Sequence, residues 1–364
     1  MKICFFTSYY PPFLDSFYKH HPEFFEMSFS GMQNLLLSKM FADTGAAYHY
    51  TLKKGNDAFL IIETCEPLQK QWAKENNIEY NNENWKMKIA FEQIKKYSPD
   101  IFYIESVFEY FGEFIKSVSP YCKKIASFIS TPLPVGLNLN GIHFILSSTP
   151  DFVKKFSELG IKSGYIHPAF DQRVLSQINI EKNKSIPFSF VGGWSEVHPI
   201  RKNALKELVA KTPIQIWGYG YKEQINIKGL KYFTNEYSKI LKRYKGECWG
   251  LEMYNILQQS FVTFNIHESL LKGNVGNMRM FEASGVGTMI LNDAGSNLAA
   301  MFEPGKEIET YTNINEAIEK LNFYLNNKEK AIEIGKNAMK RTCKDYNYDI
   351  YIDEVLKHFN SLLK

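Results

Sequence analysis

The chain has 364 residues, of which 45% are hydrophobic and 15% aromatic, which is enough to bury two cores of ordinary domain size and excludes a disordered protein. The formal net charge is +4, and the 43 lysines and arginines are spread along the sequence, which argues against a nucleic-acid-binding protein. Five scattered cysteines without CxxC spacing predict reduced thiols in a cytoplasmic protein rather than disulfides or a zinc site.

The opening residues MKICFFTSYYPP are apolar only briefly and predict a first strand rather than a signal peptide. No run in the sequence reaches the roughly 18–20 apolar residues that a membrane-spanning helix needs. The basic amphipathic stretch Glu236–Lys245 would allow peripheral contact with an anionic membrane, and a solvated helix face explains it equally well. The expected location is the cytoplasm, with peripheral contact at the inner face of the membrane left open.

Strand-like and helix-like segments alternate along the first half of the chain, which predicts a parallel sheet covered on both faces. The predicted strands are Lys2–Thr7, Ala58–Glu63, Ile101–Glu105, Lys124–Phe128, Phe144–Ser147 and Ser163–Ile166. The predicted helices between them include Gly31–Ala42, Trp85–Lys96 and Pro150–Leu159.

The alternation lapses after Asp171, where Gln177–Ser185 is polar and rich in lysine, and then resumes. The second series has predicted strands at Pro187–Val191, Ile214–Trp217, Val262–Ile266 and Thr288–Leu291, with helices at Ala204–Ala210, Met253–Gln259, Ile314–Leu325, Glu329–Arg341 and Tyr351–Leu363. We therefore expect an α/β protein of two Rossmann-like, doubly wound domains, 1–170 and 187–345, with a linker at 171–186. Such domains bind ligands at the carboxyl ends of their strands, here facing a central cleft.

The most informative segment is Asn274–Leu291, which reads as a Gly/Asn loop, a short helix and a buried strand. The loop, including Asn274 and Asn277, can approach a ligand closely, and the helix start offers unpaired N–H groups to an anion. Arg279 and Glu282 lie one turn apart on one side of this helix. A cation for phosphate and a carboxylate for ribose hydroxyls suit a nucleoside diphosphate. An ordinary αβ unit with a solvated Arg–Glu pair is the plain alternative.

Other ligand-type residues follow the predicted strands of the second half. Glycine turns permit a tight bend and close approach of a ligand, and Arg201 stands near the next helix start, where it could pair with phosphate. Aromatic residues at strand ends could flank a base, although they are more often core residues, and a histidine after a strand end is as often structural as functional. The candidates for donor binding are Gly192, Gly193, Arg201, Trp217, Gly218, Tyr219, Trp249 and His267, together with Asn274, Asn277, Arg279 and Glu282.

Several familiar site motifs are missing from the sequence. It contains no GxxxxGK[ST] loop, no GxGxxG after the first strand, no HExxH and no acidic cluster of metal-chelating spacing. These absences argue against a P-loop protein, a dinucleotide-dependent dehydrogenase and a bound metal. Arginines and a helix end would then neutralise a leaving diphosphate, and no cofactor is predicted.

The stretch Thr7–Phe29 after the first strand is rich in aromatic residues and is expected to be a long strand-end loop. Aromatic rings pack against the C–H faces of sugars, so this loop suits a carbohydrate acceptor, although it could equally fold onto its own core. His20, His21 and Glu26 are the candidate catalytic bases of this stretch.

The chain resembles the GT-B glycosyltransferases of group 1, in particular their CgeB-like branch. The likeness is carried by FVGGW, IWGYG, EMYNILQQSFVTFNIH, GNMRMFEASGVGTMILND and FEPGKEIETY in the second half, and more loosely by FYKHHP, PLQKQWAKE and STPDFVKKFSELGIKSGYIHPAFD in the first. It implies a donor-binding C-terminal domain and a final helix, 346–364, that returns to an acceptor-side first domain. Glu282 matches the second, ribose-binding carboxylate of the family's E-x7-E motif, whereas the first falls at Asn274, which is not acidic.

The predicted function is a metal-independent glycosyltransferase, and the resemblance implies that it retains the anomeric configuration. It would move a sugar from a UDP- or GDP-linked donor to a glycan, lipid-linked or protein acceptor in bacterial-type surface polysaccharide or glycoconjugate synthesis. Two alternatives stay open: a nucleotide-sugar epimerase or hydrolase on the same fold, and a non-enzymatic nucleotide- or glycan-binding protein. The oligomeric state is not predicted.

Overall fold

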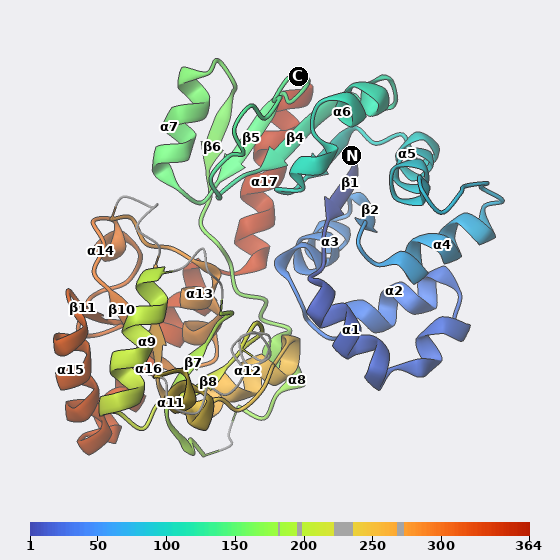
Figure 1. Cartoon of the computed structure of the whole chain (residues 1–364). Helices are drawn as coiled ribbons and strands as arrows, with labels where there is room; N and C mark the ends of the chain where they lie inside the picture. The colour runs from blue at the N-terminus through green and yellow to red at the C-terminus, as the bar shows by residue number, and fades with distance from the viewer. Residues whose placement is uncertain (181–182, 195–198, 222–235, 268–272) are drawn as a thin grey trace. The chain divides into compact units, whose positions relative to one another are not determined.

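The computed structural model describes residues 1–180, 183–194, 199–221, 236–267 and 273–364. They form two compact units (Figure 1). Unit 1 comprises Met1–His167 and Tyr348–Lys364, and unit 2 comprises Pro168–Asn347. Each unit is a parallel α/β sheet, which confirms the predicted fold class of two Rossmann-like domains.

The sheet of unit 1 has the strand order β2-β1-β3-β4-β5-β6. All its pairs are parallel, and most residues of its central strands are buried, as expected for a sheet covered on both faces. The strands are β1 (Lys2–Thr7), β2 (Asp57–Ile62), β3 (Ile101–Ile104), β4 (Lys124–Phe128), β5 (Phe144–Ser147) and β6 (Ser163–Tyr165).

Helices cover both faces of this sheet. On one face, Phe6 and Phe102 pack into a core shared with α5 (Trp85–Tyr97), α6 (Glu113–Val118) and α7 (Pro150–Glu158). On the other, the rings of Phe5 and Tyr103 meet edge to face, and α3 (Asp43–Lys53) packs against β1 and β2. The remaining helices of this unit are α1 (Pro11–His20), η1 (Pro22–Glu26), α2 (Phe29–Leu37), α4 (Glu66–Glu75), η2 (Phe108–Tyr110) and η3 (Ser119–Tyr121).

The last helix, α17 (Tyr348–Leu363), belongs to unit 1, although the chain reaches it from unit 2. Tyr348 stacks on Tyr50 of α3, and Phe359 packs edge-on against Tyr103. Asp349 pairs with Lys53 and Lys54. This confirms the expectation that the final helix returns to the first domain, three residues longer at its start than the predicted Tyr351–Leu363.

The sheet of unit 2 has the order β11-β10-β9-β7-β8. Helices α9, α11 and α15 pack with one another on one side, and α12, α13 and α16 pack together on the other. The strands are β7 (Ile186–Val191), β8 (Gln215–Trp217), β9 (Ser260–Asn265), β10 (Met289–Asp293) and β11 (Glu309–Tyr311). The helices are α8 (Val174–Gln177), α9 (Pro199–Lys211), α11 (Glu236–Arg243), α12 (Gly250–Gln259), α13 (Met278–Gly285), α14 (Leu298–Met301), α15 (Ile314–Asn326) and α16 (Lys328–Asp345).

The expected long loop at Thr7–Phe29 is wrong, because most of it is helical. Two prolines begin α1, and Phe13, Leu14 and Phe17 bury one side of it. Phe24 anchors η1 in the same way, with its ring against Phe17. The aromatic residues of this stretch therefore serve largely as core for unit 1. Helices α3 and α4 and strand β11 were likewise not predicted.

The predicted linker at 171–186 falls within unit 2. Val174 is fully buried, and α8 packs against α12. Lys184 is also tucked in: its ammonium group donates to the carbonyls of Gln258 and Ser260, both at 2.8 Å. Lys184 of this polar stretch thus packs at the end of α12 and the start of β9.

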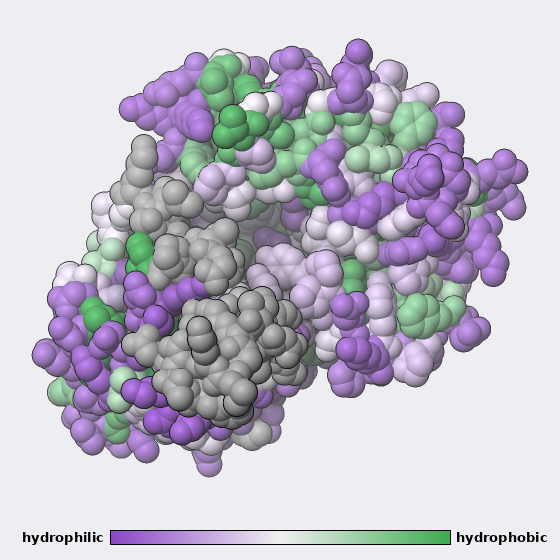
Figure 2. All heavy atoms as spheres, in the orientation of Figure 1, coloured by the Kyte–Doolittle hydropathy of each residue, from purple (hydrophilic) through white to green (hydrophobic). Residues whose placement is uncertain are grey.

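The described surface is mostly polar in the view of Figure 2, with apolar side chains gathered over the upper part of unit 1. Val135 and Leu159 are among the large apolar residues of unit 1 that are exposed, at 106% and 57%. Among the described residues, no helix is both long enough and apolar enough to span a bilayer.

Candidate functional site

The order of strands in unit 2 reverses between β7 and β9, because β8 lies on one side of β7 and the later strands on the other. Open α/β sheets bind ligands outside the carboxyl ends of the strands at such a point. The helix after β7 is α9 and the helix after β9 is α13, and they cover opposite faces. The candidate donor residues of the sequence come from the ends of these two strands and of β8.

Glycines let the ends of β7 and β8 touch. Gly218 has φ +140°, and a Cβ atom there would lie 2.1 Å from the carbonyl oxygen of Gly192. A Cβ atom on Gly193 would lie 2.6 Å from the ring of Tyr219. The backbone N–H of Gly192 donates to the carbonyl of Trp217 at 2.9 Å. Any larger side chain would separate the two strand ends, so the glycines fix where Tyr219 lies.

Two of the predicted aromatic residues form a stack. The rings of Tyr219 and Trp249 lie 5.6 Å apart with 18° between their planes. Tyr219 follows β8, and Trp249 stands at the start of α12, so two separate elements build this platform. Trp217 is 9% exposed and belongs to the strand itself. The stack offers a flat apolar surface of the kind a base requires.

Arg201 lies in the first turn of α9 and turns back toward the glycines. Its Nη1 donates to the carbonyl of Gly193 at 3.3 Å, and its guanidinium lies 6.0 Å from the ring centre of Phe190. Lys202, which was not singled out in the sequence, is 9% exposed, with Nζ 5.3 Å from the ring centre of Trp194. Two neighbouring cations therefore stand beside the end of β7.

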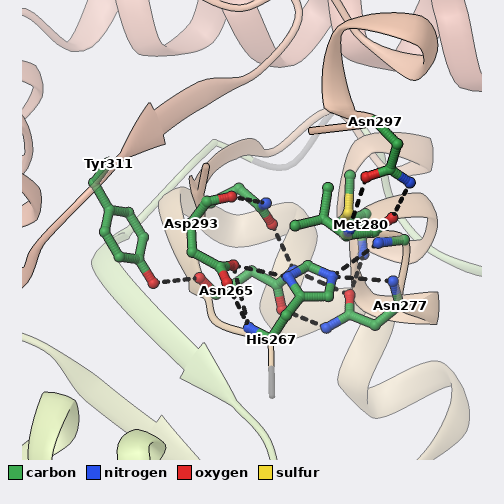
Figure 3. A network of polar contacts seen from close by, with 10 residues as sticks. Asn265, His267, Asn277, Met280, Asp293, Asn297 and Tyr311 are labelled. Carbon is green, nitrogen blue, oxygen red and sulfur yellow. Dashed lines mark hydrogen bonds and ion pairs between the residues drawn. The ribbon is translucent and has the colours of Figure 1, made fainter. Parts of the chain in front are cut away.

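The loop before α13 is held by His267, which follows β9 (Figure 3). The Nδ1 atom of His267 lies 2.7 Å from Oδ1 of Asp293, and its Nε2 atom accepts the backbone N–H groups of Gly276 and Asn277 at 3.0 and 3.1 Å. Both ring nitrogens are thus engaged within the protein. His267 thus links the loop to Asp293 at the end of β10 and fixes the position of the loop backbone.

A second set of polar contacts fixes the start of α13. The side-chain amides of Asn265 and Asn277 bond to each other in both directions, at 3.0 and 3.1 Å. Asn277 also caps the helix by accepting the backbone N–H of Met280 at 3.3 Å. Asn265 reaches Asn292 on the neighbouring strand at 2.7 Å. The sheet thereby dictates where the helix begins.

Arg279 and Glu282 form the expected pair on the first turns of α13. Nη1 of Arg279 lies 2.8 Å from Oε2 of Glu282, and it also contacts the sulfur of Met253 at 2.7 Å. Their side chains are 19% and 16% exposed. Within the described residues, Nε of Arg279 has no hydrogen-bond partner although it is buried. A cation with unused donor capacity thus stands at a helix start.

Asn274 stands where the resembling family has its first carboxylate. Its Oδ1 accepts the hydroxyl of Ser296 at 3.3 Å, while Asn297 holds the next residue, Val275, by both its N–H and its carbonyl at 2.8 and 2.7 Å. A pocket of about 440 Å³ opens beside Asn274, His267 and Asp293, under α9 and the start of α15. In the described part of the chain, no group of three or more His, Cys, Asp or Glu side chains is arranged to hold a metal ion.

The candidate catalytic residues of the first half lie at the end of α1 and in η1. His20 is exposed and its Nδ1 contacts the carbonyl of Ser16 at 2.7 Å, while Nδ1 of His21 lies 2.8 Å from Glu23. Glu26 is exposed. These three side chains share one region of unit 1, but none lies at a strand end. Two carboxylates that the sequence reading missed, Glu63 and Glu105, directly follow β2 and β3.

Comparisons with known proteins agree with this geometry. Residues 199–357, under half of the chain, match the family described as "Glycosyl transferase-like". A search of curated protein sequences gives no match. A glycosyltransferase from Rickettsia africae aligns with 100% of this chain and 98% of its own at 12% identity and a TM-score of 0.60.

Two further solved structures share the fold. Anabaena HepE in complex with UDP aligns over 99% of this chain and 100% of its own, at 12% identity and a TM-score of 0.58. Sucrose-phosphate synthase from Thermosynechococcus elongatus aligns over 78% and 81%, at 11% identity and a TM-score of 0.52. At such identities the likeness concerns the fold, which is the GT-B arrangement of two Rossmann-like domains.

Proposed function

We propose that the chain, which has a GT-B fold and a glycosyl transferase-like segment at residues 199–357, is a glycosyltransferase that takes its sugar from a nucleoside diphosphate donor held by unit 2. The acceptor would be a glycan, a lipid-linked glycan or a protein in bacterial-type surface polysaccharide or glycoconjugate synthesis. The enzyme would work in the cytoplasm, with peripheral contact at the membrane where the acceptor is lipid-linked.

The observation that carries the proposal is the start of α13. Arg279 and Glu282 sit on its first turns, 2.8 Å apart, at the strand-order reversal. The loop in front of them is fixed by His267 through two backbone N–H groups. Arg279 would bind the diphosphate with the helix N–H groups, and Glu282 would bind the ribose hydroxyls.

The ends of β7 and β8 would contact the diphosphate from a second side and would bind the base. Arg201, beside the Gly192-Gly193 turn, would contact the diphosphate from the α9 side. The stacked Tyr219 and Trp249 would take the base. Solved structures of HepE hold UDP, UDP with glucose, and UDP-glucose, which favours a UDP-linked donor here over a GDP-linked one.

The proposed reaction retains the anomeric configuration and needs no metal. The acceptor hydroxyl forms the new bond to the anomeric carbon while the bond from that carbon to the diphosphate oxygen breaks. The acceptor proton passes to the leaving diphosphate. Arg279, Arg201 and the start of α13 would stabilise the charge that develops on the diphosphate, the task that a metal ion performs in other transferases.

A thermal-shift screen of the full chain against UDP, GDP, CMP, ADP and TDP tests the donor site. A ligand at a hundredfold excess over its dissociation constant stabilises the native state by about 2.7 kcal/mol. We expect one diphosphate to shift the wild type and neither Arg279→Ala nor Glu282→Ala. Arg243→Ala, on α11, is the matched control and should respond like the wild type. A wild type that responds to no nucleotide would refute the proposal.

A further inference from the structure

Unit 1 has its own reversal of strand order. β2 lies on one side of β1, and β3 with all later strands lies on the other, so the reversal falls between β1 and β3. The last residue of β1 is Thr7, and the residue directly after β3 is Glu105. These two side chains therefore mark the place in the first sheet that corresponds to the donor site of the second.

Glu105 is held in one orientation by two threonines. The hydroxyl of Thr7 donates to Oε2 and the hydroxyl of Thr44, in the first turn of α3, donates to Oε1. Both threonines are 1% exposed, whereas Glu105 is half-buried at the sheet edge. Its backbone N–H donates to the carbonyl of Phe6 at 3.0 Å. One hydroxyl on each oxygen leaves lone pairs on the carboxylate for a further donor.

The described surroundings of Glu105 include an acidic side chain and several tyrosines. The titratable groups that face it are Asp43 on α3, Tyr9 after β1, Tyr103 on β3 and Tyr351 on α17. The Tyr9 hydroxyl is 0% exposed and, within the described residues, has no hydrogen-bond partner. Burial, followed by the charges of Glu105 and Asp43, raises the pKa of Tyr9.

A carboxyl in this setting is suited to exchange a proton or a hydrogen bond near neutral pH. Burial, followed by the charge of Asp43, raises the pKa of Glu105 to about 8, and the hydrogen bonds from Thr44 and Thr7 oppose that rise. Glu63, the other carboxylate at a strand end, contrasts with it. Ser8, Tyr110 and Lys86 already bind Glu63 at 2.5, 3.1 and 3.1 Å, and its side chain is 1% exposed.

We propose that Glu105, set between Thr7 and Thr44 with the Tyr9 hydroxyl behind it, binds a hydroxyl group of the sugar acceptor. This rests on the proposed function, since it assigns the acceptor side of that reaction to unit 1. It replaces His20, His21 and Glu26 as the group of unit 1 that contacts the acceptor. Those three lie at the end of α1, directly after it and in η1, whereas Glu105 directly follows a strand.

Saturation-transfer NMR of glycoside binding to the full chain tests the assignment. The probes are the methyl glycosides of glucose, galactose, mannose and N-acetylglucosamine. The wild type is expected to bind at least one glycoside. At pH 9, above the pKa of Glu105, Glu105→Gln keeps the shape but lacks the charge of the carboxylate, and should bind the glycoside at least about tenfold more weakly than the wild type. Glu113→Gln, whose side chain is 91% exposed on α6, is the control and should match the wild type.

The pH dependence of glycoside binding adds a readout that a purely structural role would not move. Affinity in the wild type should change between pH 6.5 and pH 9, about the region in which Glu105 titrates, and this change should be absent in Glu105→Gln. If Glu105→Gln does not fold, as judged by its melting curve, Glu105→Asp is used, because it keeps the charge but withdraws it by one methylene group.

Failure of this inference can be told apart from failure of the proposed function by titrating UDP into the same samples. UDP binding to all variants, together with equal glycoside binding by the wild type and both Glu105 variants, would overturn the acceptor role while leaving the donor site intact. The absence of glycoside binding in the wild type would overturn it as well. If the wild type does not bind UDP, that result would count against the proposed function instead.

Discussion

The imidazole of His267 lies 2.7 Å from the carboxylate of Asp293, and this contact determines which ring nitrogen carries the proton. Asp293 also accepts the backbone N–H of His267 at 3.0 Å, so its oxygens act as acceptors and the proton resides on Nδ1 of the ring. Nε2 is then free to accept the two loop N–H groups. A carboxylate that orients a histidine in this way is a supporting group rather than a ligand contact.

We expect His267→Ala to weaken nucleotide binding without removing any group that touches the nucleotide. The loop N–H groups of Gly276 and Asn277 would lose their acceptor, at a cost of about 1–3 kcal/mol. Calorimetric titration with UDP measures the loss, which at about 1.4 kcal/mol is tenfold in affinity. His49→Ala, at an exposed position of α3, is the control. UDP affinity in His267→Ala equal to that of the wild type would contradict the positioning role.

Replacing Arg279 separates its charge from its shape. Arg279→Ala should cost about 2–4 kcal/mol of transition-state stabilisation, the range for a lost charge-stabilising donor. Arg279→Lys keeps the charge but lacks the planar guanidinium that pairs with two phosphate oxygens. Its activity should therefore lie between that of the wild type and that of Arg279→Ala. Release of nucleoside diphosphate from the donor is the assay. A lysine variant as active as the wild type would mean that Arg279 acts as a point charge only.

Gly218 should tolerate no side chain. Gly218→Ala would strain the backbone at φ +140° and press Cβ against the carbonyl of Gly192. Gly136→Ala is a matched control, because φ is +76° there and no atom lies within 4 Å of the added Cβ. The first variant should lose about 1–3 kcal/mol more of unfolding free energy than the second. Urea unfolding of both gives the comparison, and equal losses would rule out the close approach of the two strand ends.

The alternation of apolar and amphipathic segments was sufficient to predict nearly every strand, because buried parallel strands leave continuous apolar runs. Val262–Ile266 was predicted and β9 spans Ser260–Asn265. The start of α13 could also be predicted from the sequence, because Asn277 is a good N-cap residue and Arg279 and Glu282 follow at helical spacing. Here the local signal and the tertiary role coincide.

The acceptor side shows the opposite case. Glu105 has no distinctive neighbours in the sequence, and it acquires its character from Thr7, which is 98 residues away, and Thr44, which is 61 residues away. In Thr7–Phe29 the density of aromatic residues masked the helical spacing of Phe13 and Phe17. Such properties depend on long-range contacts, which spacing along the chain does not record.

Lys184 offers a test by pH, because burial lowers its pKa to about 7. Between pH 7 and the usual lysine value of 10.5, the unfolded chain binds more protons than the folded one, so the lysine makes stability rise with pH. Relative to Lys184→Met, the wild type should gain up to about 1.4 kcal/mol per pH unit in that window. Urea unfolding at pH 7, 8, 9 and 10 measures this gain, with Lys336→Met, at an exposed site, as control. If stability changes with pH in the same way in the wild type and in Lys184→Met, the pKa of Lys184 is not lowered in the folded state.

Glu105 should act on stability with the opposite sign. Its pKa rises from the usual 4.5 to about 8, so between these values the folded state keeps a proton that the unfolded chain has released. Stability from this residue is present below pH 4.5 and is lost as the pH climbs toward 8, by up to about 1.4 kcal/mol per unit. Glu105→Gln cannot titrate, so urea unfolding from pH 5 to pH 9 should show a shallower decline in that variant, while Glu113→Gln follows the wild type. If the decline is the same in all three proteins, Glu105 is ionised throughout the range, and the carboxyl that meets the acceptor would be a charged acceptor of hydrogen bonds at every working pH.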